Sequence, residues 1–316
     1  MRKAITCICI ALSGMIYAQF DAQISQYMLH QNAFNPAAVG EKNLIEIIGE
    51  HRINMISMPG AGSVSIFSVN SPVKFGTSTH GLGLTFINDR VGLFTNQSFH
   101  AQYAYKTKLG AGKLSAGLQL GVVGIGFSGD SLSQNKITLG SYHDISGDEY
   151  IPQTSVVGMK FDIGLGALYT LRNWYAGVSF LHLNQPVVKW GDKTEFKQYG
   201  MFYTSAGMHF QLSDPKFVLH PSVLIKSDFS LWQFDLSSRV EYDNRFWGGL
   251  TIRPFSSVVL MAGINIAGGF AISYSADVAT SKLISSNYGS HEIMFAYSFE
   301  YVFSKKTTKQ KSIRYL

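Results

Sequence analysis

The chain has 316 residues, of which 46% are apolar and only 15% are charged, and its formal net charge is +6. The positive excess lies at the two ends: without Arg2, Lys3 and the five cations of residues 304–316, 19 basic residues remain against 20 acidic ones. The body of the chain is therefore near −1 net, which excludes a basic nucleic-acid-binding face.

Residues 1–18 have the pattern of a secretory signal peptide. A basic start precedes an apolar run that ends at Ala18, a small residue, and this predicts cleavage before Gln19. Cys7 and Cys9 both lie in this stretch, so we expect no disulfide and no cysteine-ligated metal in the rest of the chain. No apolar run of 18 residues follows, which excludes ordinary transmembrane helices.

Residues 19–43 differ in pattern from everything that follows, and we expect them to form a short N-terminal periplasmic segment. They contain a helix-compatible piece around Ser25–His30 and a turn at Asn35-Pro36. Two interpretations stay open: a lid whose aromatic residues plug the periplasmic mouth of a barrel, or a surface on which a partner docks. For the second, the candidate partner-binding residues are Tyr27, Asn32, Asn35 and Pro36.

Segments with a period of two fill residues 44–303. In 98–106, for example, Phe99, Tyr103 and Tyr105 alternate with His100 and Gln102. Apolar and aromatic residues on one face and polar residues on the other are typical of a membrane β-barrel with a polar lumen. We predict an all-β transmembrane outer-membrane barrel of about 14 antiparallel strands: 44–52, 62–70, 80–87, 98–106, 113–127, 159–171, 173–183, 200–212, 217–226, 231–242, 246–253, 257–266, 269–277 and 291–303.

The connections support this barrel. An even number of strands returns both ends of the barrel to one side. Tight turns such as 109–112 and 172–173 alternate with longer connections, which we expect near 53–61, 71–79, 88–97, 128–158, 184–199 and 278–290. Because outer-membrane barrels have short periplasmic turns and longer external loops, the pattern predicts that both termini are periplasmic.

The last strand and the tail that follows it contrast sharply. Ile293, Phe295 and Tyr297 point to one face, and Glu292 points to the other. Residues 304–316 then form a basic periplasmic tail without an acidic residue. The further candidates for partner binding are its cations, which are Lys305, Lys306, Lys309, Lys311 and Arg314. A solvated tail without a partner is the plain alternative.

No enzyme signature is present, and we predict no catalytic residue, no cofactor and no metal site. The chain has no HExxH, GxSxG or P-loop motif, and its nine histidines are scattered. The charged residues expected to point inward include Asp162, Asp235, Arg239, Glu241 and Glu300. They could line a pore or hold a catalytic pair, but a hydrated ion-pair network in the lumen is favoured. A lipase would need Ser and His together at the lipid rim, and the sequence does not establish that proximity.

Several short motifs resemble the PorP/SprF family of type IX secretion system membrane proteins of Bacteroidota. The likeness covers essentially the whole chain after the signal peptide. It is carried by Gln23-Ile-Ser-Gln-Tyr-Met28, Asn32-Ala-Phe-Asn-Pro-Ala-Ala-Val-Gly40, His51-Arg52, Gly81-Leu-Gly-Leu84, Asn88-Asp-Arg-Val-Gly92, Tyr103-Ala-Tyr105, Leu114-Ser-Ala-Gly-Leu118 and Lys311-Ser-Ile-Arg-Tyr-Leu316.

The resemblance implies a non-enzymatic outer-membrane component that supports export of cargo with C-terminal secretion signals. It also implies periplasmic partners: a ring of PorK-like and PorN-like proteins and a peptidoglycan-binding lipoprotein. Some gliding-motility members are similar in serving one adhesin. The alternative function is a porin-like barrel or one that transports a hydrophobic solute, and an outer-membrane hydrolase is a more distant alternative.

Overall fold

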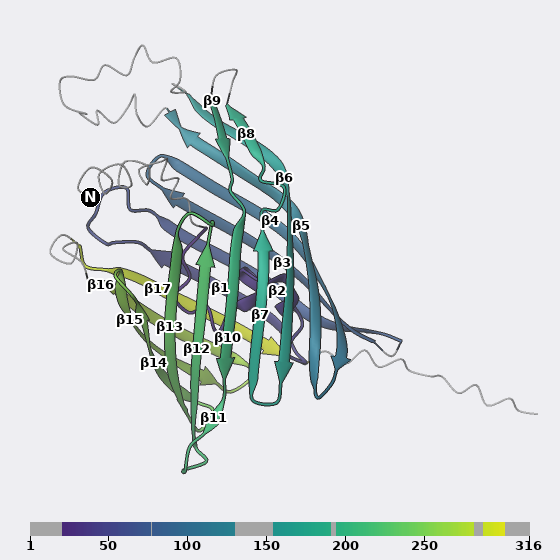
Figure 1. Ribbon diagram of the computed structural model, residues 1–316. Coiled ribbons are helices and arrows are strands. Elements are labelled where there is room, and N and C mark those ends of the chain that lie inside the picture. The colour runs from purple at the N-terminus through teal and green to yellow at the C-terminus, as the bar shows by residue number, and fades with distance from the viewer. Residues whose placement is uncertain (1–20, 77, 130–153, 191–193, 281–286, 301–316) are drawn as a thin grey trace, which may run out of the picture.

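The computed structural model describes residues 21–76, 78–129, 154–190, 194–280 and 287–300, and it consists almost entirely of β-strands. The first half of the wall contains β1 (Ile45–Ile53), β2 (Ser63–Phe75), β3 (Ser78–Val91), β4 (Phe94–Leu109), β5 (Gly112–Ser128), β6 (Ser155–Leu171) and β7 (Trp174–Leu181). The second half contains β10 (Met201–Met208), β11 (Phe210–Gln211), β12 (Phe217–Ser227), β13 (Trp232–Tyr242), β14 (Phe246–Arg253), β15 (Ser257–Ile266), β16 (Phe270–Ala279) and β17 (Ser290–Phe299). A separate hairpin contains β8 (Val187–Trp190) and β9 (Thr194–Lys197), and it extends beyond the wall (Figure 1).

These strands close into an antiparallel barrel. The sheet has 15 strands, but β10 and β11 are interrupted only at His209 and form one wall strand, so the barrel has fourteen. β10 pairs with both β7 and β12, and β1 pairs with β17 in the register Ile45↔Phe299. The predicted outer-membrane barrel of 14 strands is therefore confirmed. Among the described residues, no helix has the length and apolarity to cross a bilayer.

Side chains alternate between the two faces of the wall as predicted. On β4, Phe99 and Tyr103 are exposed on the outside, whereas His100 and Gln102 are buried in the interior. On β17, Phe295 points outward and Glu292 inward. A lipid-facing apolar surface around a polar interior follows from this alternation. β17 ends at Phe299 instead of residue 303, and residues 301–316, with the basic tail, lie outside the described residues.

The two ends of the barrel differ in their connections. At one end, called here the turn end, neighbouring strands are joined by tight turns, such as Gly110 with the following residue and Arg172 with Asn173. At the other end, called the loop end, most connections are longer, including 54–62 and 182–200. Two predicted long connections are wrong. Residues 71–79 and 88–97 belong mostly to strands, because β2 and β3 pair as far as Phe75↔Ser78 and β3 and β4 as far as Val91↔Phe94.

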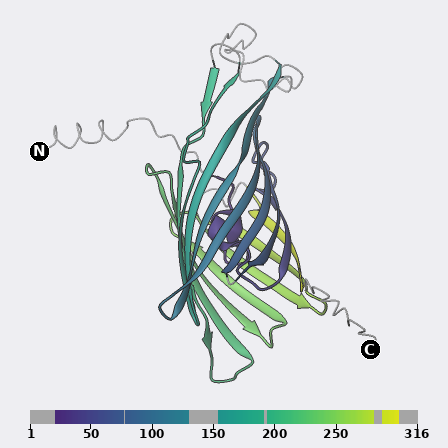
Figure 2. The ribbon, with the colours of Figure 1, turned by 90° about the vertical axis from the view of Figure 1, so that its right-hand side faces the viewer.

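The segment before β1 lies inside the barrel and runs along it. Its two short 3₁₀ turns, η1 (Gln31–Ala33) and η2 (Pro36–Ala38), are enclosed by the strands (Figure 2). Asp21 bonds to Gln198 in the connection at the loop end, whereas Glu41 bonds to Lys113 beside a tight turn. Residues 21–44, called here the plug, therefore run from the loop end to the turn end. As the even strand count predicts, β1 begins and β17 ends at the same end of the barrel, the turn end. The first described residue, Asp21, lies at the other end, the loop end.

Candidate functional site

A belt of small inward residues crosses five neighbouring strands at one level. The pairing register runs from Gly81 on β3 to Ala104, Gly117, Gly166 and finally Ser179 on β7. Small side chains at successive paired positions leave a shallow trough across the inner wall, perpendicular to the strands. This small-residue belt gives the plug room to approach the wall closely.

The plug lies in this trough, with its backbone against Gly81 and Gly117 and the Asn35 side chain against Gly166. A β-carbon on Gly81 would lie 2.0 Å from Val39 O, one on Gly117 would lie 2.2 Å from Ala37 N, and one on Gly166 would lie 2.2 Å from Asn35 Oδ1. Only glycine permits such contact. Ser179 completes the belt by donating a 2.6 Å hydrogen bond to Phe34 O.

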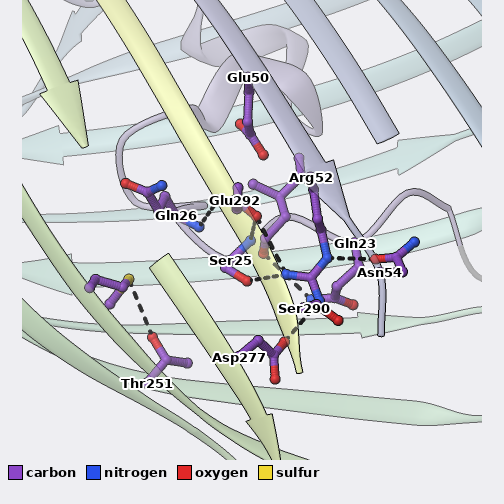
Figure 3. Close-up of polar contacts among 12 residues, drawn as sticks. Gln23, Ser25, Gln26, Glu50, Arg52, Asn54, Thr251, Asp277, Ser290 and Glu292 are labelled. Carbon is purple, nitrogen blue, oxygen red and sulfur yellow. Dashed lines mark hydrogen bonds and ion pairs between the residues drawn. The ribbon is translucent and has the colours of Figure 1, made fainter. Parts of the chain in front are cut away.

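Arg52 on β1 ties the plug to the wall through charge (Figure 3). Its guanidinium donates to Ser25 Oγ at 2.6 Å and to Asp277 Oδ2 at 2.9 Å, and it lies 3.6 Å from Glu292. Glu292 accepts the backbone N–H groups of Ser25 and Gln26 at 2.8 and 3.0 Å. All these side chains are buried, so each charge meets a partner in the dry interior.

A second arginine continues this network toward Tyr27. Arg253 on β14 donates to Asp235 at 2.9 Å and also bonds to Asp277, which it shares with Arg52. The Tyr27 hydroxyl lies 3.1 Å from Ser222 Oγ and 3.4 Å from Asp235 O. The plug is thus bound on the β1 and β17 side by hydrogen bonds to buried charged side chains of the wall, and on the opposite side by the belt.

His30, Glu50 and Ser68 form a constellation that resembles a catalytic triad in geometry. His30 Nδ1 lies 3.0 Å from Glu50 Oε2, and His30 Nε2 lies 2.8 Å from Ser68 Oγ. Burial lowers the pKa of His30 to about 4, so the ring is neutral and joins both neighbours as one donor and one acceptor. His30 and Ser68 have no exposed surface. A substrate cannot reach this serine, and the constellation holds the plug in place.

The start of the plug is held at the loop end by a chain of acids and histidines. Asp21 accepts from Tyr203 at 2.8 Å and lies 3.2 Å from His182, which in turn lies 2.9 Å from Asp162. His100 binds the other oxygen of Asp162 at 2.8 Å. Burial alone would lower the pKa of His182, but Asp21 and Asp162 raise it to about 10. Within the described ranges no cluster of such side chains is arranged to hold a metal ion.

Apolar contacts fill the middle of the lumen. Ile24 and Phe34 of the plug pack in one buried cluster with inward apolar residues of β2, β7, β10 and β12, which are Val64, Ile66, Leu181, Met201, Tyr203 and Leu224. A cavity of only about 50 Å³ remains on the loop side. On the turn side, two cavities of about 530 and 240 Å³ adjoin the plug.

Comparison with known proteins identifies the family. The model of the family described as type IX secretion system membrane protein PorP/SprF matches residues 16–297. The chain belongs to this family. No curated protein matches it. The family and the fold together make the chain an outer-membrane component of type IX secretion.

Solved structures similar to this PorP/SprF-family chain are outer-membrane barrels. The toluene transporter TbuX of Ralstonia pickettii is 11% identical with a TM-score of 0.50, over 85% of this chain and 92% of its own. The toluene transporter TodX of Pseudomonas putida is 9% identical with a TM-score of 0.48, over 89% and 95%. A FadL homologue of Pseudomonas aeruginosa is 9% identical with a TM-score of 0.48, over 85% and 93%. The TbuX likeness shows the fold alone.

Six of the eight motifs that carried the PorP/SprF resemblance meet in the structure, and the motif at 311–316 lies outside the described residues. The motif of residues 32–40 lies on the belt, and three belt residues come from the motifs at 81–84, 103–105 and 114–118. Arg52 of the short motif at 51–52 holds Ser25 of the motif at 23–28. These pieces are distant in sequence, and their common role is to hold the plug.

The predicted partner-binding residues of the plug are all buried in the lumen. Tyr27 reaches Ser222, and Gln102 donates to the backbone oxygen of Asn32 at 2.8 Å. Asn35 caps η2 by accepting from Ala37 N at 2.9 Å, and Pro36 is the first residue of that turn. Their burial fits the plug interpretation, while the partner-binding prediction for them stays a prediction. Lys305, Lys306, Lys309, Lys311 and Arg314 lie outside the described residues.

The inward charges mostly form the ion-pair network that the sequence favoured. Asp162 pairs with His182, Asp235 pairs with Arg253, and Arg239 pairs with Glu241 inside the barrel. Glu300 differs, because it follows β17 and is exposed. Sequence reasoning assigned no role to the central residues of the network, Arg52, Arg253, Asp277 and Glu292. The sequence signal that could have found these four residues is that each lies on the polar, inward side of a strand with a period of two.

Proposed function

We propose that this chain is a plugged, non-enzymatic docking component of the type IX secretion system, which binds its periplasmic partners at the turn end. The observation that carries the proposal is the plug. Hydrogen bonds to buried charged side chains, the small-residue belt and apolar packing hold it across the lumen. A barrel closed in this way contributes surfaces instead of a pathway through its centre.

The basic tail is the proposed docking arm. β17 ends at the turn end, so the chain that follows begins on the side of the short turns, which outer-membrane barrels direct toward the periplasm. Its five cations would attract an acidic surface and speed association with it. Proposed partners are the PorK-like and PorN-like ring proteins and the peptidoglycan-binding lipoprotein, and the export of cargo with C-terminal secretion signals would depend on this contact.

Neutralising the tail tests the proposal. In one variant Lys305, Lys306, Lys309, Lys311 and Arg314 become glutamine. In its control the four lysines become arginine, which preserves the charge. Purification from native outer membranes should recover ring proteins with the wild type and the control but not with the glutamine variant. Equal recovery of ring proteins and normal cargo export with the glutamine variant would contradict the docking role.

The transport alternative makes an opposite prediction in planar bilayers. A plug that fills the lumen should leave the intact protein without steady conductance. Deleting residues 21–40 should open a pore, because it removes the segment that occupies the barrel. Steady open channels from the intact protein would favour a porin-like or solute-transport barrel over a docking component.

A further inference from the structure

The turn end of the lumen contains a vestibule that the described residues leave unfilled. Its two cavities, of about 530 and 240 Å³, lie side by side and share lining residues from the plug, β1, β13 and β15. Met28 and Leu29 of the plug line the larger cavity together with Leu168 and Trp174 of the wall. The vestibule therefore offers an apolar contact surface close to the barrel mouth.

Three buried polar atoms in the larger cavity have no hydrogen-bond partner: Asn32 Nδ2, Tyr175 Oη and Arg239 Nε. Asn32 is only 4% exposed. Gln31 lies near Tyr175, but it makes no hydrogen bond that satisfies the hydroxyl. All three groups can donate a hydrogen bond. Because a buried unpaired donor costs about 1–3 kcal/mol, three around one cavity indicate an acceptor that belongs there.

The charges around the vestibule favour an anion. Glu41 lies 3.0 Å from Lys106 and 2.7 Å from Lys113, and Glu46 lies 2.5 Å from Lys42. Glu241 accepts from Arg239 at 3.0 Å, and Arg172 lines the cavity in addition. Three carboxylates and three cations line the larger cavity, and they are Glu41, Glu46, Glu241, Lys42, Arg172 and Arg239. All three carboxylates are already paired with cations, whereas Arg239 keeps an unpaired N–H group, so an acceptor with negative charge suits the cavity.

From these observations we propose that the vestibule is a binding site for an apolar group that bears a carboxylate. The carboxylate accepts from Asn32, Tyr175 and Arg239, and the apolar part lies against Leu29 and Trp174. Arg239 is fixed for this contact, because its guanidinium lies over the ring of Trp247 at 5.3 Å and bonds to Glu241. The ligand would touch plug and wall together. The site does not depend on the proposed docking role of the basic tail.

Matched acids and amides test the site on the full chain in lipid nanodiscs. N-acetyl-leucine and N-acetyl-leucinamide differ only in the carboxylate and represent the end of a polypeptide, whereas hexanoate and hexanamide represent a free amphiphile. Ligand-observed NMR should show that an acid binds at least about tenfold more tightly than its amide. The pair with the larger difference identifies the source of the carboxylate. Equal binding of acid and amide, or no binding of either acid, would mean that water alone satisfies the three donors and would overturn the proposal.

Variants of the donors locate the binding. Tyr175→Phe removes one hydroxyl, and Arg239→Gln removes one charge. Each substitution should weaken binding of the acid about tenfold and leave binding of the amide unchanged. Arg245→Gln is the control, because Arg245 is exposed in the β13–β14 turn and does not line the vestibule. Heat-modifiable gel mobility confirms that each variant is a folded barrel. If folded Tyr175→Phe and Arg239→Gln both bind the acid like the wild type, the site is refuted.

Discussion

Replacing Gly117 with alanine should displace the plug while the barrel stays closed. A β-carbon on Gly117 would lie 2.2 Å from Ala37 N and 2.6 Å from Ala37 Cα. These are backbone atoms, which cannot swing aside as the end of a side chain can, and ordinary van der Waals contact begins at 3.4 Å. The difference, 3.4 minus 2.2, requires the plug to retreat by about 1 Å.

The cost follows from the hydrogen bonds that this retreat stretches. Ser115 donates to Ala37 O at 2.7 Å, Ser179 to Phe34 O at 2.6 Å, and Asn35 to Ala167 O at 3.2 Å. A net contribution of about 1 kcal/mol for each gives about 3 kcal/mol in total. The fraction of molecules in which the plug is detached from the belt should therefore rise by about a hundredfold.

Hydrogen–deuterium exchange measures this change directly. In Gly117→Ala, protection of the amides of residues 34–40 should fall by about two orders of magnitude, while the amides of β4 and β5 stay protected. Gly124→Ala is the matched control on the opposite face of the same strand, where the nearest atom to the new β-carbon is Met159 Cγ at 3.4 Å. Equal protection of residues 34–40 in the wild type and both variants would refute the reasoning.

Two further predictions concern buried groups of the plug network. Arg52→Met should destabilise the folded barrel by about 3–5 kcal/mol, because it leaves buried Glu292 without its cation. The temperature at which the gel mobility shifts measures this loss of stability. Arg245→Met, which changes an exposed arginine, should have little effect. Burial lowers the pKa of His30 to about 4 against 6.5 outside the protein, so the free state takes up a proton first as the pH falls. Relative to His30→Gln, the wild-type plug should therefore lose about 2 kcal/mol between pH 6.5 and pH 5. Proteolysis within residues 21–40 should increase over this range in the wild type but not in His30→Gln, and a pH-independent wild type would contradict the assignment.

The strands could be predicted because their signal is local. Each apolar face meets lipid and each polar face meets the lumen, so a period of two marks a strand without knowledge of its neighbours. The ends of β2, β3 and β4 were missed because polar residues such as Asn88 and Gln97 still pair beyond the apolar band. The hairpin of β8 and β9 was missed because strands of four residues are too short to show a period.

The belt could not be predicted because it depends on register. Gly81, Gly117 and Gly166 each look like an ordinary strand glycine, and they meet only through the pairing of Gly81 with Ala104, of Ala104 with Gly117 and of Gly117 with Gly166. Two misjudged connections, 71–79 and 88–97, would have shifted that register. The direction of the plug has no periodic signal, and an argument from strand count could not show that its first described residue, Asp21, lies beside Gln198 at the loop end.

The inner wall itself indicates that the plug is the resident state. A water-filled barrel has a polar interior, yet Ile66 on β2 and Leu224 on β12 point into this lumen, where they pack with Ile24 and Phe34 of the plug. Burying each of those two plug side chains contributes about 1.5–3 kcal/mol, and withdrawal would expose both sides of the contact to water. An open lumen would therefore need a partner that covers the same apolar patch. A partner that enters from the turn end meets the vestibule first, so it can bind without displacing the plug.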